Sequence, residues 1–503
     1  MIYTAVDCQG FAGGFTLGVV QAGFQLIGKR EMRGGFGVAN CEANRHLLGD
    51  DWSSETVEPE AWSAPNADLV FGNPPCSGFS VLSSKQFRGV DSKINTCMWA
   101  FAEYAARVRP QIAIFESVQL AFTQGRSLMQ ALRARLEELT GDKWALHHVL
   151  HNAYSVGGPA QRRRYFWVAS RVPFGVERPQ PDRLPVLRDV IGDLATLDEP
   201  CWAPQLYWDS KPSWYAEQLR SPIGRVDGHV ALNNPNTRRT RELLNEIDWH
   251  PGEHAQKVTR RYFDLHGDLP SSWSHLVDKL KGQDFFQGYN TPTMWNPDGP
   301  ARVITGAGML NGVHWQLRRT FTHREAARIL GFPDDWKIEP LRRVSGLFMT
   351  WGKGITVDCG RWIATWASRA LSGDPGSYVG DPISDDEWLI DVTNDWKTAL
   401  TRCDTVEHSE VKVTRRTIVT EAPTIEATPR RGRPRPQETQ DRDAQVLAAI
   451  GPEPATREAL VQKTGIDPKL VYLSLYRLRR DGLVERRREN GAHVWAQTAP
   501  SDG

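Results

Sequence analysis

A cysteine in the segment GNPPCSGFS (72–80) is the residue whose surroundings point most directly to chemistry. The apolar run ADLVFG (67–72) predicts a buried strand, and the two prolines and the Ser-Gly pair around Cys76 predict a rigid loop at its carboxyl end. A thiolate is a good nucleophile near neutral pH and a good leaving group, so this position suits reversible covalent catalysis. A buried structural cysteine is the alternative, although so tight a loop packs poorly.

This segment resembles the Pro-Cys-x-Gly-Phe-Ser signature of the cytosine-C5 DNA methyltransferase family, and the resemblance extends in separate motifs from residue 1 to about 371. In that family the cysteine adds to C6 of a cytosine flipped out of the duplex, and C5 then takes a methyl group from S-adenosylmethionine. The resemblance implies that the chain is a DNA (cytosine-5-)-methyltransferase and that Cys76 is its nucleophile. It also implies that Asn73 and Pro74 border the cofactor and that Ser80 lies toward the DNA.

A second motif, PQIAIFESVQ (110–119), resembles the family's strand that ends in Glu-Asn-Val, with Ser117 where the family usually has Asn. The resemblance implies that Glu116 hydrogen-bonds or protonates N3 of the flipped cytosine and so assists attack at C6. A carboxyl group that donates a proton there needs a raised pKa, which an apolar strand end can supply. A plain surface glutamate at a strand terminus is the alternative.

Two later segments extend the match. GGPAQRRRYFWVA (157–169) resembles the family's Gln-x-Arg-x-Arg segment, with Ala160 in the Gln position, and implies that Arg162 and Arg164 lie near the base's O2 and the DNA backbone. An arginine run that is merely a solvated face is the alternative. LRRTFTHREAARILGFPDDW (317–336) resembles the family's late motif, where we expect a capped helix that packs the returning chain against the sheet.

A glycine-rich turn after the first predicted strand, VDCQGFAGGFTLG (6–18), resembles the family's Asp-x-Phe-x-Gly-x-Gly-Gly loop. Such a turn lets the backbone approach a ligand closely and points a helix N-terminus at its carboxylate. Gln9 stands where the family has a Phe against the adenosyl group, and Phe11 replaces the first Gly. The residues that the resemblance places around the cofactor here are Asp7, Gln9, Phe11, Gly13 and Gly14.

Three acidic residues are further candidates for the cofactor site. Glu31, at the end of the second predicted strand, is placed to accept the ribose hydroxyls, and Glu42 is its rival if the intervening MRGGFG is an insertion. Asp51, in the segment GDDW, resembles the family's acidic residue that contacts the adenine amino group. Each of these residues alone is more often a plain solvated carboxylate.

The family's final motif, usually Gly-Asn-Ser/Ala-Val, here contains a lysine: Gly352-Lys353-Gly354-Ile355. Gly354 would border the cofactor, and Lys353 would bring a cation close to its sulfonium. Lys353 could turn outward or pair with Asp358. Alternatively, the transferred group itself is anionic, as in carboxy-S-adenosylmethionine, and Lys353 pairs with its carboxylate. The chain would then be a DNA cytosine carboxymethyltransferase that makes 5-carboxymethylcytosine.

Several segments are candidates for reading DNA. The Pro-, Trp- and Arg-rich stretch 172–300 occupies the place of the family's target-recognition region. Arg431 and Arg433, in Arg-Gly-Arg-Pro, resemble an AT-hook that enters the minor groove. The pattern from 441 onward matches a winged helix-turn-helix, with Arg477 and Arg480 on its third helix. A winged helix used for protein contact is the alternative, and a catalytically silent DNA-binding regulator is a third interpretation of the whole chain.

The elements that must position these residues predict an α/β fold. Strand-like and helical runs alternate over 1–171, which predicts a doubly wound, mostly parallel sheet of the Rossmann-like methyltransferase kind, with ligands at the carboxyl ends of its strands. An inserted recognition domain and a C-terminal winged helix complete the expected architecture. The expected domains are the catalytic and cofactor-binding core (1–171), the target-recognition region (172–300), the return of the core (301–371), a linker with the AT-hook-like segment (372–440) and the winged helix (441–503).

Composition limits the alternatives. The formal net charge of +1 excludes a uniformly basic coat protein, although not local basic faces. No apolar run reaches the roughly 18 residues that span a membrane, and the first residues lack a secretion signal. Seven scattered cysteines without a CxxC pair predict neither a disulfide framework nor a zinc site. We therefore expect a monomer without metal or membrane partners, bound to double-stranded DNA in the cytoplasm of a bacterium or a phage-infected host.

Overall fold

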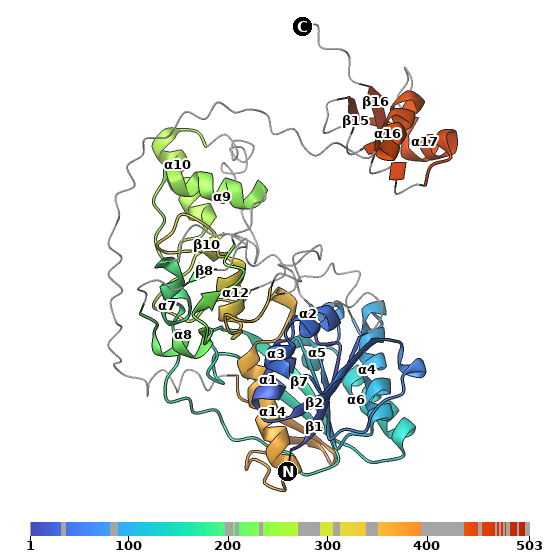
Figure 1. Ribbon diagram of the computed structural model, residues 1–503, viewed down its shortest axis with the longest axis vertical. Helices are drawn as coiled ribbons and strands as arrows, with labels where there is room; N and C mark the ends of the chain where they lie inside the picture. Colours follow the sequence, from blue (N-terminus) through green and yellow to red (C-terminus); the bar gives the residue numbers. More distant parts are fainter. Residues whose placement is uncertain are drawn as a thin grey trace. The chain divides into compact units, whose positions relative to one another are not determined.

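The computed structural model describes two compact units, Met1–Thr414 and Arg415–Gly503. Figure 1 shows the helices and strands of each unit. The described residues are 2–31, 37–80, 89–196, 205–206, 211–230, 235–269, 292–304, 312–338, 351–393, 437–450 and 455–497, the last range without 468–469, 472–473, 476–477, 479–482 and 490–491.

A nine-stranded sheet forms the centre of the first unit, in the order β12-β13-β6-β7-β5-β4-β1-β2-β3. Its strands are β1 (Thr4–Cys8), β2 (Gln25–Glu31), β3 (Ser53–Thr56), β4 (Leu69–Gly72), β5 (Ile112–Ser117), β6 (Ala145–Asn152), β7 (Arg163–Ser170), β12 (Asp381–Ser384) and β13 (Glu387–Asp391). Only β7 and β12 run against their neighbours. The predicted mostly parallel α/β sheet is confirmed, and the carboxyl ends of β1, β2, β4 and β5 share one edge.

Helices cover both faces of this sheet. Alternate residues of β5 show the division, because Ile112 and Ile114 pack on one face and Ala113 and Phe115 on the other. The first face is covered by α1 (Gly14–Gln21) and α14 (Val357–Leu371), and the second by α4 (Thr96–Val108) and α6 (Arg126–Thr140), on either side of the strands in Figure 1. This arrangement fixes the strand ends from which the candidate site is built.

The sheet continues beyond the point where the linker was predicted to begin. β13 pairs in parallel with β6, and β12 returns antiparallel beside it. The prediction of a linker from 372 is therefore wrong for 381–391. Its physical reason is the buried Glu387 side chain, which accepts hydrogen bonds from Arg126 (2.9 and 3.1 Å), Gln130 (2.9 Å) and His148 (2.6 Å). The acidic segment 381–391 thus joins the sheet by strand pairing and through one buried carboxylate.

Glu387→Gln is expected to lower the free energy of unfolding by about 1–3 kcal/mol at neutral pH. Burial alone would raise the pKa of Glu387, but Arg126, Gln130 and His148 lower it from 4.5 to about 2. A carboxyl with a lowered pKa stabilises the fold above its unfolded value, and this contribution is lost as the pH falls through the folded value. The difference between wild type and variant should therefore shrink between about pH 4.5 and 2, as measured by urea unfolding at stepped pH.

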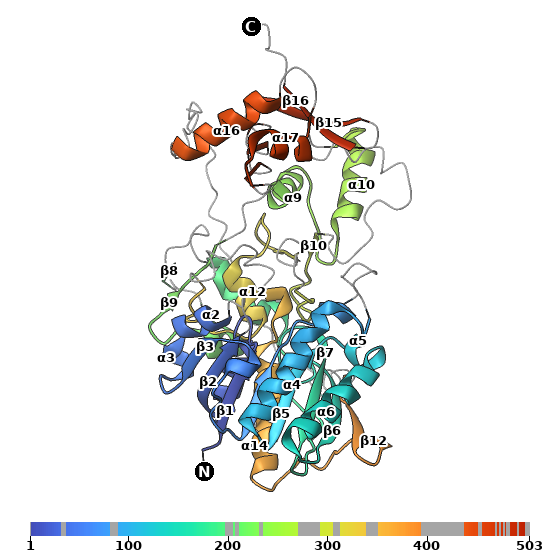
Figure 2. The ribbon, with the colours of Figure 1, turned by 90° about the vertical axis from the view of Figure 1, so that its right-hand side faces the viewer.

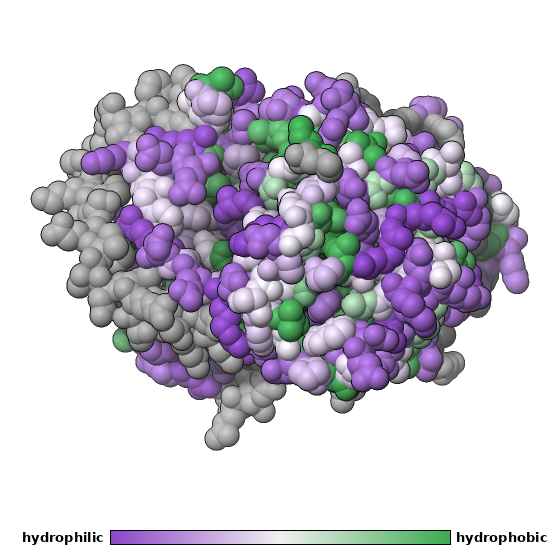
Figure 3. Space-filling model, turned by 90° about the horizontal axis from the view of Figure 1, so that it is seen from below, coloured by the Kyte–Doolittle hydropathy of each residue, from purple (hydrophilic) through white to green (hydrophobic). Residues whose placement is uncertain are grey.

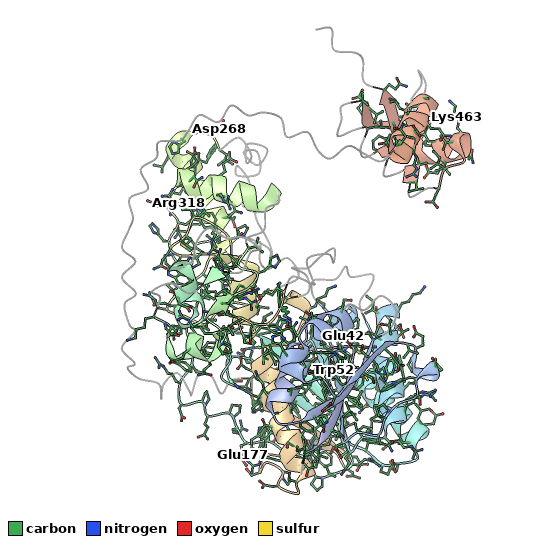
Figure 4. The ribbon with its side chains drawn as sticks, in the orientation of Figure 1. Glu42, Trp52, Glu177, Asp268, Arg318 and Lys463 are labelled. Carbon is green, nitrogen blue, oxygen red and sulfur yellow. The ribbon has the colours of Figure 1, made fainter. Side chains whose placement is uncertain are left out.

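The matched control is Glu177→Gln. Glu177 (Figure 4) is an exposed carboxylate, and it accepts hydrogen bonds from Ser377, which lies shortly before Glu387 in the chain. It should change the stability little at any pH. Equal losses in the two variants, or a Glu387→Gln difference that grows in acid, would contradict the assignment.

A second lobe of the first unit follows β7. Its elements are α7 (Leu187–Ile191), α8 (Trp214–Leu219), β8 (Gln205–Leu206), β9 (Arg225–Val226), α9 (Pro235–Glu246), α10 (Ala255–His266), β10 (Thr293–Met294), β11 (Gly312–Val313) and α12 (His323–Ile329). α12 lies at the end of the sheet away from the N-terminus (Figure 2). Two helices of this lobe, α9 and α10, lie inside the Pro-, Trp- and Arg-rich stretch 172–300. Leu243 and Val258 bury one side of these polar helices in a small core that reaches Val313, beyond the predicted boundary at 300.

The surface of the described residues is largely hydrophilic on the side where the N-terminus lies (Figure 3). No helix among the described residues is long and apolar enough to cross a membrane. A search of the same residues also finds no cluster of three or more His, Cys, Asp or Glu side chains that could hold a metal ion.

The second unit contains α16 (Gln437–Ile450), α17 (Arg457–Thr464) and the antiparallel three-stranded sheet β14-β16-β15. Its strands are β14 (Ala455–Thr456), β15 (Val484–Glu489) and β16 (Ala492–Gln497). Val446, Leu460, Leu475 and Trp495 share its core. α16 begins at Gln437, four residues before the predicted 441. The predicted DNA contacts Arg431, Arg433, Arg477 and Arg480 lie outside the described residues.

Candidate active site

The cysteine loop leaves the sheet at the end of β4. Gly72 approaches β1 so closely that a Cβ there would lie 1.9 Å from the Cys8 carbonyl oxygen, which explains the glycine. Cys76 then precedes a single helical turn, Ser77–Phe79, and is partly buried. Ser80 ends this turn. The loop therefore holds the thiol at the carboxyl edge of the sheet, as its sequence predicts.

Glu116 lies beside this loop because β5 is the parallel neighbour of β4, with Phe115 paired to Gly72. Asn73 Nδ2 donates a hydrogen bond to Glu116 Oε2 (2.5 Å), and Arg164 Nε lies 3.0 Å from Oε1. The side chain is 1% exposed. Burial raises the pKa of Glu116, while Arg164, Arg162 and Asn73 oppose this effect. The structure thus contains a buried, cation-paired carboxyl at the tip of the strand next to the thiol.

The electrostatic surroundings of Cys76 include this carboxyl. Burial raises the pKa of the thiol, and so does Glu116. Arg164, the Val118 backbone amide and the Ser117 hydroxyl lower the pKa of Cys76. Cys76, Glu116 and Arg164 are thus brought together as a group of a thiol, a carboxyl and a guanidinium.

The alkylation of Cys76 should respond to the charge of Glu116. In Glu116→Gln one cause of the raised thiol pKa is removed, so the thiolate fraction at a given pH rises. We expect the pH profile of iodoacetamide labelling at Cys76, read by mass spectrometry of its peptide, to move to lower pH. Cys97, which is also partly buried, is the internal control. A profile at Cys76 that does not move, or that moves together with Cys97, would show that the carboxylate does not act on this sulfur.

Arg162 binds the main chain of two later segments. Its side chain is fully buried, and it donates hydrogen bonds to the carbonyl oxygens of Ile304 (3.0 Å), Gly352 (2.9 Å) and Gly354 (2.6 Å). Through these bonds Arg162 anchors the segment that carries Lys353. Its Nε is buried without a hydrogen-bond partner among the described residues, and its charge also acts on Glu116 and Cys76, so the contact of Arg162 with the base or the DNA stays a prediction.

The glycine-rich loop joins β1 to α1 and takes unusual backbone conformations. Gln9 (φ 72°), Phe11 (φ 44°) and Gly13 (φ 89°) all lie in the left-handed region that favours glycine. A Cβ on Gly14 would meet the Ile355 carbonyl oxygen at 2.2 Å, so the 352–355 segment packs directly on the loop. The Lys353 side chain beside it is exposed. The two predicted cofactor segments are thus adjacent.

Glu31 ends β2 and accepts a hydrogen bond from the Gly10 amide at Oε1 (2.9 Å). Its rival Glu42 lies in α2 (Gly37–Ala43) and is occupied by Arg45 (2.6 and 3.0 Å) and Ser54 (2.5 Å), with Trp52 close by (Figure 4). Between the two acids, the structure brings Glu31 to the glycine-rich loop.

Asp51 lies at the wrong end of its strand for the predicted contact. β3 is parallel to β2, with Thr56 opposite Glu31, so the exposed Asp51 precedes the strand by two residues and lies toward the opposite edge of the sheet. At about 3.3 Å per residue, the length of β3 separates it from the cofactor loop. The assignment of Asp51 to the adenine amino group is therefore corrected.

Two residues near this edge were not anticipated from the sequence. Glu58 follows β3 and, together with Glu31, raises the pKa of Cys97, whose carbonyl oxygen accepts a hydrogen bond from Gln9 Nε2. Lys29 is fully buried between Asp7 and Glu31. The signal for Glu58 is its place after the strand rather than before it. Nothing in the charged end of this strand, Lys29-Arg30-Glu31, indicates that Lys29 is buried.

The residues around the glycine-rich loop fit S-adenosylmethionine. Gln9 Oε1 and Asn73 Oδ1 are buried and have no hydrogen-bond partner among the described residues, and both are acceptors. An unpaired buried acceptor is costly, so such atoms indicate a missing donor. S-adenosylmethionine offers donors in its ammonium, ribose hydroxyl and adenine amino groups. Asp7 Oδ2 already accepts from Thr16 and Lys29, but its Oδ1 is a third buried acceptor without a partner among the described residues.

Comparison with known proteins points to one protein family. Residues 3–368 match the family model of the C-5 cytosine-specific DNA methylases. The type II methyltransferase M.DdeI of Desulfomicrobium norvegicum is 23% identical over 366 residues, 70% of this chain and 82% of that protein. M.AplI of Arthrospira platensis is 33% identical over 33% of this chain, and DNA (cytosine-5)-methyltransferase 1A of Oryza sativa is 25% identical over 54%. These matches span 44% and 20% of the two relatives, so the chain covers less than half of either.

Among solved structures, a protein named as a prophage-encoded DNA modification methyltransferase of E. coli has a TM-score of 0.52 at 17% identity, covering 74% of this chain and 99% of that one. This similarity concerns the fold alone.

Proposed function

The chain belongs to the C-5 cytosine-specific DNA methylase family, and from this premise we propose that it transfers a methyl group from S-adenosylmethionine to C5 of a flipped cytosine in double-stranded DNA. The observation that carries the proposal is the meeting of Cys76 with the buried Glu116–Arg164 pair at one edge of the sheet. A thiol and an acid that meet at one edge of the sheet can act on the same small ring.

The reaction needs little beyond these side chains. The Cys76 thiolate forms a bond from Sγ to C6 while Glu116 donates a hydrogen bond or a proton to N3, so electron density gathers at C5. S-adenosylmethionine, when bound, supplies an electrophilic methyl group. Loss of the C5 proton to a base then restores the C5–C6 double bond and expels the Cys76 thiolate, and N3 returns its proton to Glu116. Arg164 holds the carboxyl in place and offsets its charge.

The cofactor is held by the glycine-rich loop and the strand ends beside it. We assign its contacts to Gln9, Phe11, Gly13, Gly14, Glu31, Asn73, Pro74 and Gly354. Glu31 accepts the ribose hydroxyls, and the acceptors of Gln9 and Asn73 receive donors of the cofactor. Asp7 holds Thr16 and Lys29 through Oδ2 and offers Oδ1 as a further acceptor for the cofactor.

DNA contacts come from several parts of the chain. Ser80 follows the cysteine loop, and the lobe within 172–300, extended to Val313, occupies the position of a target-recognition domain. The helices and three-stranded sheet of Arg415–Gly503 suit a winged helix, in which Arg477 and Arg480 face DNA. Arg431 and Arg433 form an AT-hook in the linker before it. A cytoplasmic, monomeric enzyme of a bacterial or phage modification system is consistent with this assignment.

Trapping on DNA that contains 5-fluorocytosine tests the proposal. The fluorine cannot leave C5 as a proton, so the wild type should remain covalently attached to the DNA in the presence of S-adenosylmethionine. Cys76→Ser should give no adduct, and the matched variant Cys97→Ser should give as much as the wild type. An adduct in Cys76→Ser would sink the assignment of the nucleophile. No adduct in any form would favour a silent DNA-binding regulator.

A donor that carries a carboxylate is a second candidate, favoured by the position of Lys353. The Gly352 and Gly354 carbonyls on either side of Lys353 are fixed by Arg162, and the same segment packs on Gly14. The main chain of Lys353 therefore lies against the cofactor loop, and its exposed side chain carries a cation in this segment. Mass spectrometry of DNA nucleosides after incubation with either cofactor separates the two products. Equal methyl transfer by the wild type and Lys353→Asn, without 5-carboxymethylcytosine, would remove this candidate.

A further inference from the structure

A lysine is buried beneath the glycine-rich loop between two carboxylates. Lys29 lies in β2, and its side chain is 0% exposed. Its Nζ lies 2.6 Å from Asp7 Oδ2 and 3.5 Å from Glu31 Oε1. Asp7 Oδ2 also accepts from Thr16 Oγ1 (2.5 Å), and Glu31 Oε1 accepts from the Gly10 amide (2.9 Å). A buried ammonium is tolerated only when it is paired, and here each partner is itself fixed by the cofactor loop or by α1.

The loop is shaped around this lysine. A Cβ on Gly10 would lie 2.5 Å from Lys29 Nζ and 2.2 Å from Asp7 Oδ2, so only glycine fits there without moving the ion pair. Gln9 and Phe11, on either side of Gly10, both take left-handed conformations that cost L-residues energy. The strained loop, the glycine and the buried cation are thus parts of one arrangement.

We propose that Lys29 is a positioning residue for the cofactor: it holds the Glu31 carboxylate under Gly10 in its charged form, so that Oε2 accepts the ribose hydroxyls. No hydrogen bond among the described residues engages Oε2. The inference rests on the cofactor site of the proposed function and adds the residue that maintains it.

The charges around Glu31 explain why a cation is needed. Asp7 of β1 faces Glu31 together with Lys29, Cys41 of α2 lies near Lys29, and Cys97 of α4 lies near Glu31 and Glu58. Burial raises the pKa of Glu31 and Asp7 raises it further, whereas Lys29 and the Gly10 amide lower it. Without Lys29, two carboxyls would share an apolar space, and one of them would take up a proton more readily.

The dissociation constant of S-adenosylhomocysteine, which carries the ribose but no transferable group, tests this role by calorimetry on the full chain. The wild type should bind almost equally at pH 6 and pH 8. Lys29→Met should bind about tenfold more weakly at pH 6, which corresponds to one pKa unit at Glu31, and should recover toward pH 8. Adding Glu31→Gln should abolish this pH dependence.

Arg30→Met is the matched control, since Arg30 is the next buried cation of β2 but contacts Ser53 and Trp62 instead of Glu31. If the inference holds, the binding of S-adenosylhomocysteine by Arg30→Met should not gain a pH dependence. Unchanged binding in Lys29→Met at both pH values, or an equal and pH-independent loss in both variants, would overturn the inference. If Lys29→Met does not fold, Gly10→Ala replaces it, with Gly28→Ala, whose Cβ would meet only ordinary contacts at 3.6 Å, as control. Equal affinities in that pair would overturn it as well.

Failure of this inference differs from failure of the proposed function. A wild type that forms the 5-fluorocytosine adduct while Lys29→Met binds normally refutes only the role of Lys29. A wild type that neither binds S-adenosylhomocysteine nor forms the adduct refutes the proposed function.

Discussion

Glu116→Gln is expected to reduce methyl transfer by about 10²–10⁴-fold, the range typical of removing a general acid. The amide keeps the size of the side chain but cannot pass a proton to N3. The effect should fall on the chemical step, so single-turnover transfer of labelled methyl groups to DNA is the measurement. The affinity for S-adenosylhomocysteine should change little, because Glu116 contacts Asn73 and Arg164 rather than the glycine-rich loop.

The pH dependence gives this expectation a sign. The active form of Glu116 carries the proton, so the rate should fall as the pH rises through its pKa, which burial raises and Arg164 lowers. In Arg164→Met the opposing cation is lost, the pKa of Glu116 rises further, and this alkaline limb should move to higher pH. Glu103→Gln, a partly exposed acid on α4, is the control and should keep the wild-type profile. An unchanged alkaline limb in both Glu116→Gln and Arg164→Met would exclude the acid role.

The proximity of Cys76 and Glu116 could be predicted because it depends on local patterns. Cys76 follows one apolar strand and Glu116 lies at the end of the next, and parallel neighbouring strands bring such ends to one edge. The same logic predicts the glycine-rich loop after β1. What the sequence could not supply is the partner of each side chain.

The arginine segment shows this limit. Arg162 and Arg164 are two residues apart in one motif, yet Arg164 pairs with Glu116 while Arg162 binds carbonyls 142 to 192 residues further along the chain. No local pattern distinguishes a guanidinium that meets a carboxylate from one that meets the main chain. Long-range packing decides between them.

The predictions for Asp51 and for the segment that forms β13 were wrong for related reasons. The position of Asp51 depends on where β3 begins, and strand boundaries are the least certain part of a pattern. β13 is short, and the acidic residues around it hide the strand pattern in the sequence. Its Glu387 side chain binds His148 and Arg126, which lie more than 230 residues earlier in the chain. A short edge segment acquires its structure from the sheet that it joins.

Arg328→Met should destabilise the first unit by about 3–5 kcal/mol, the cost of leaving buried charges without their partner. Arg328, on α12, is fully buried and binds Asp334 (2.8 and 2.5 Å) and Asp193 (2.5 and 3.3 Å). It also donates to the Val190 carbonyl (3.0 Å). The late motif thereby ties the chain's return to the segment that follows α7. Removing the guanidinium leaves Asp334 and Asp193 facing one another, with Arg220 (2.9 Å from Asp193) and the more distant Arg324 (3.9 Å from Asp334) as the remaining cations.

Urea unfolding followed by tryptophan fluorescence measures this loss, since every tryptophan except Trp495 lies in the first unit. Arg369→Met is the matched control, because Arg369 pairs with Asp374 through exposed side chains (43% and 68% exposed) and such pairs contribute only about 0–1 kcal/mol. The two variants remove the same charge and differ in burial. If both lost the same stability, the buried network would not be what joins α12 to the segment after α7, and α12 would be held by its apolar contacts alone.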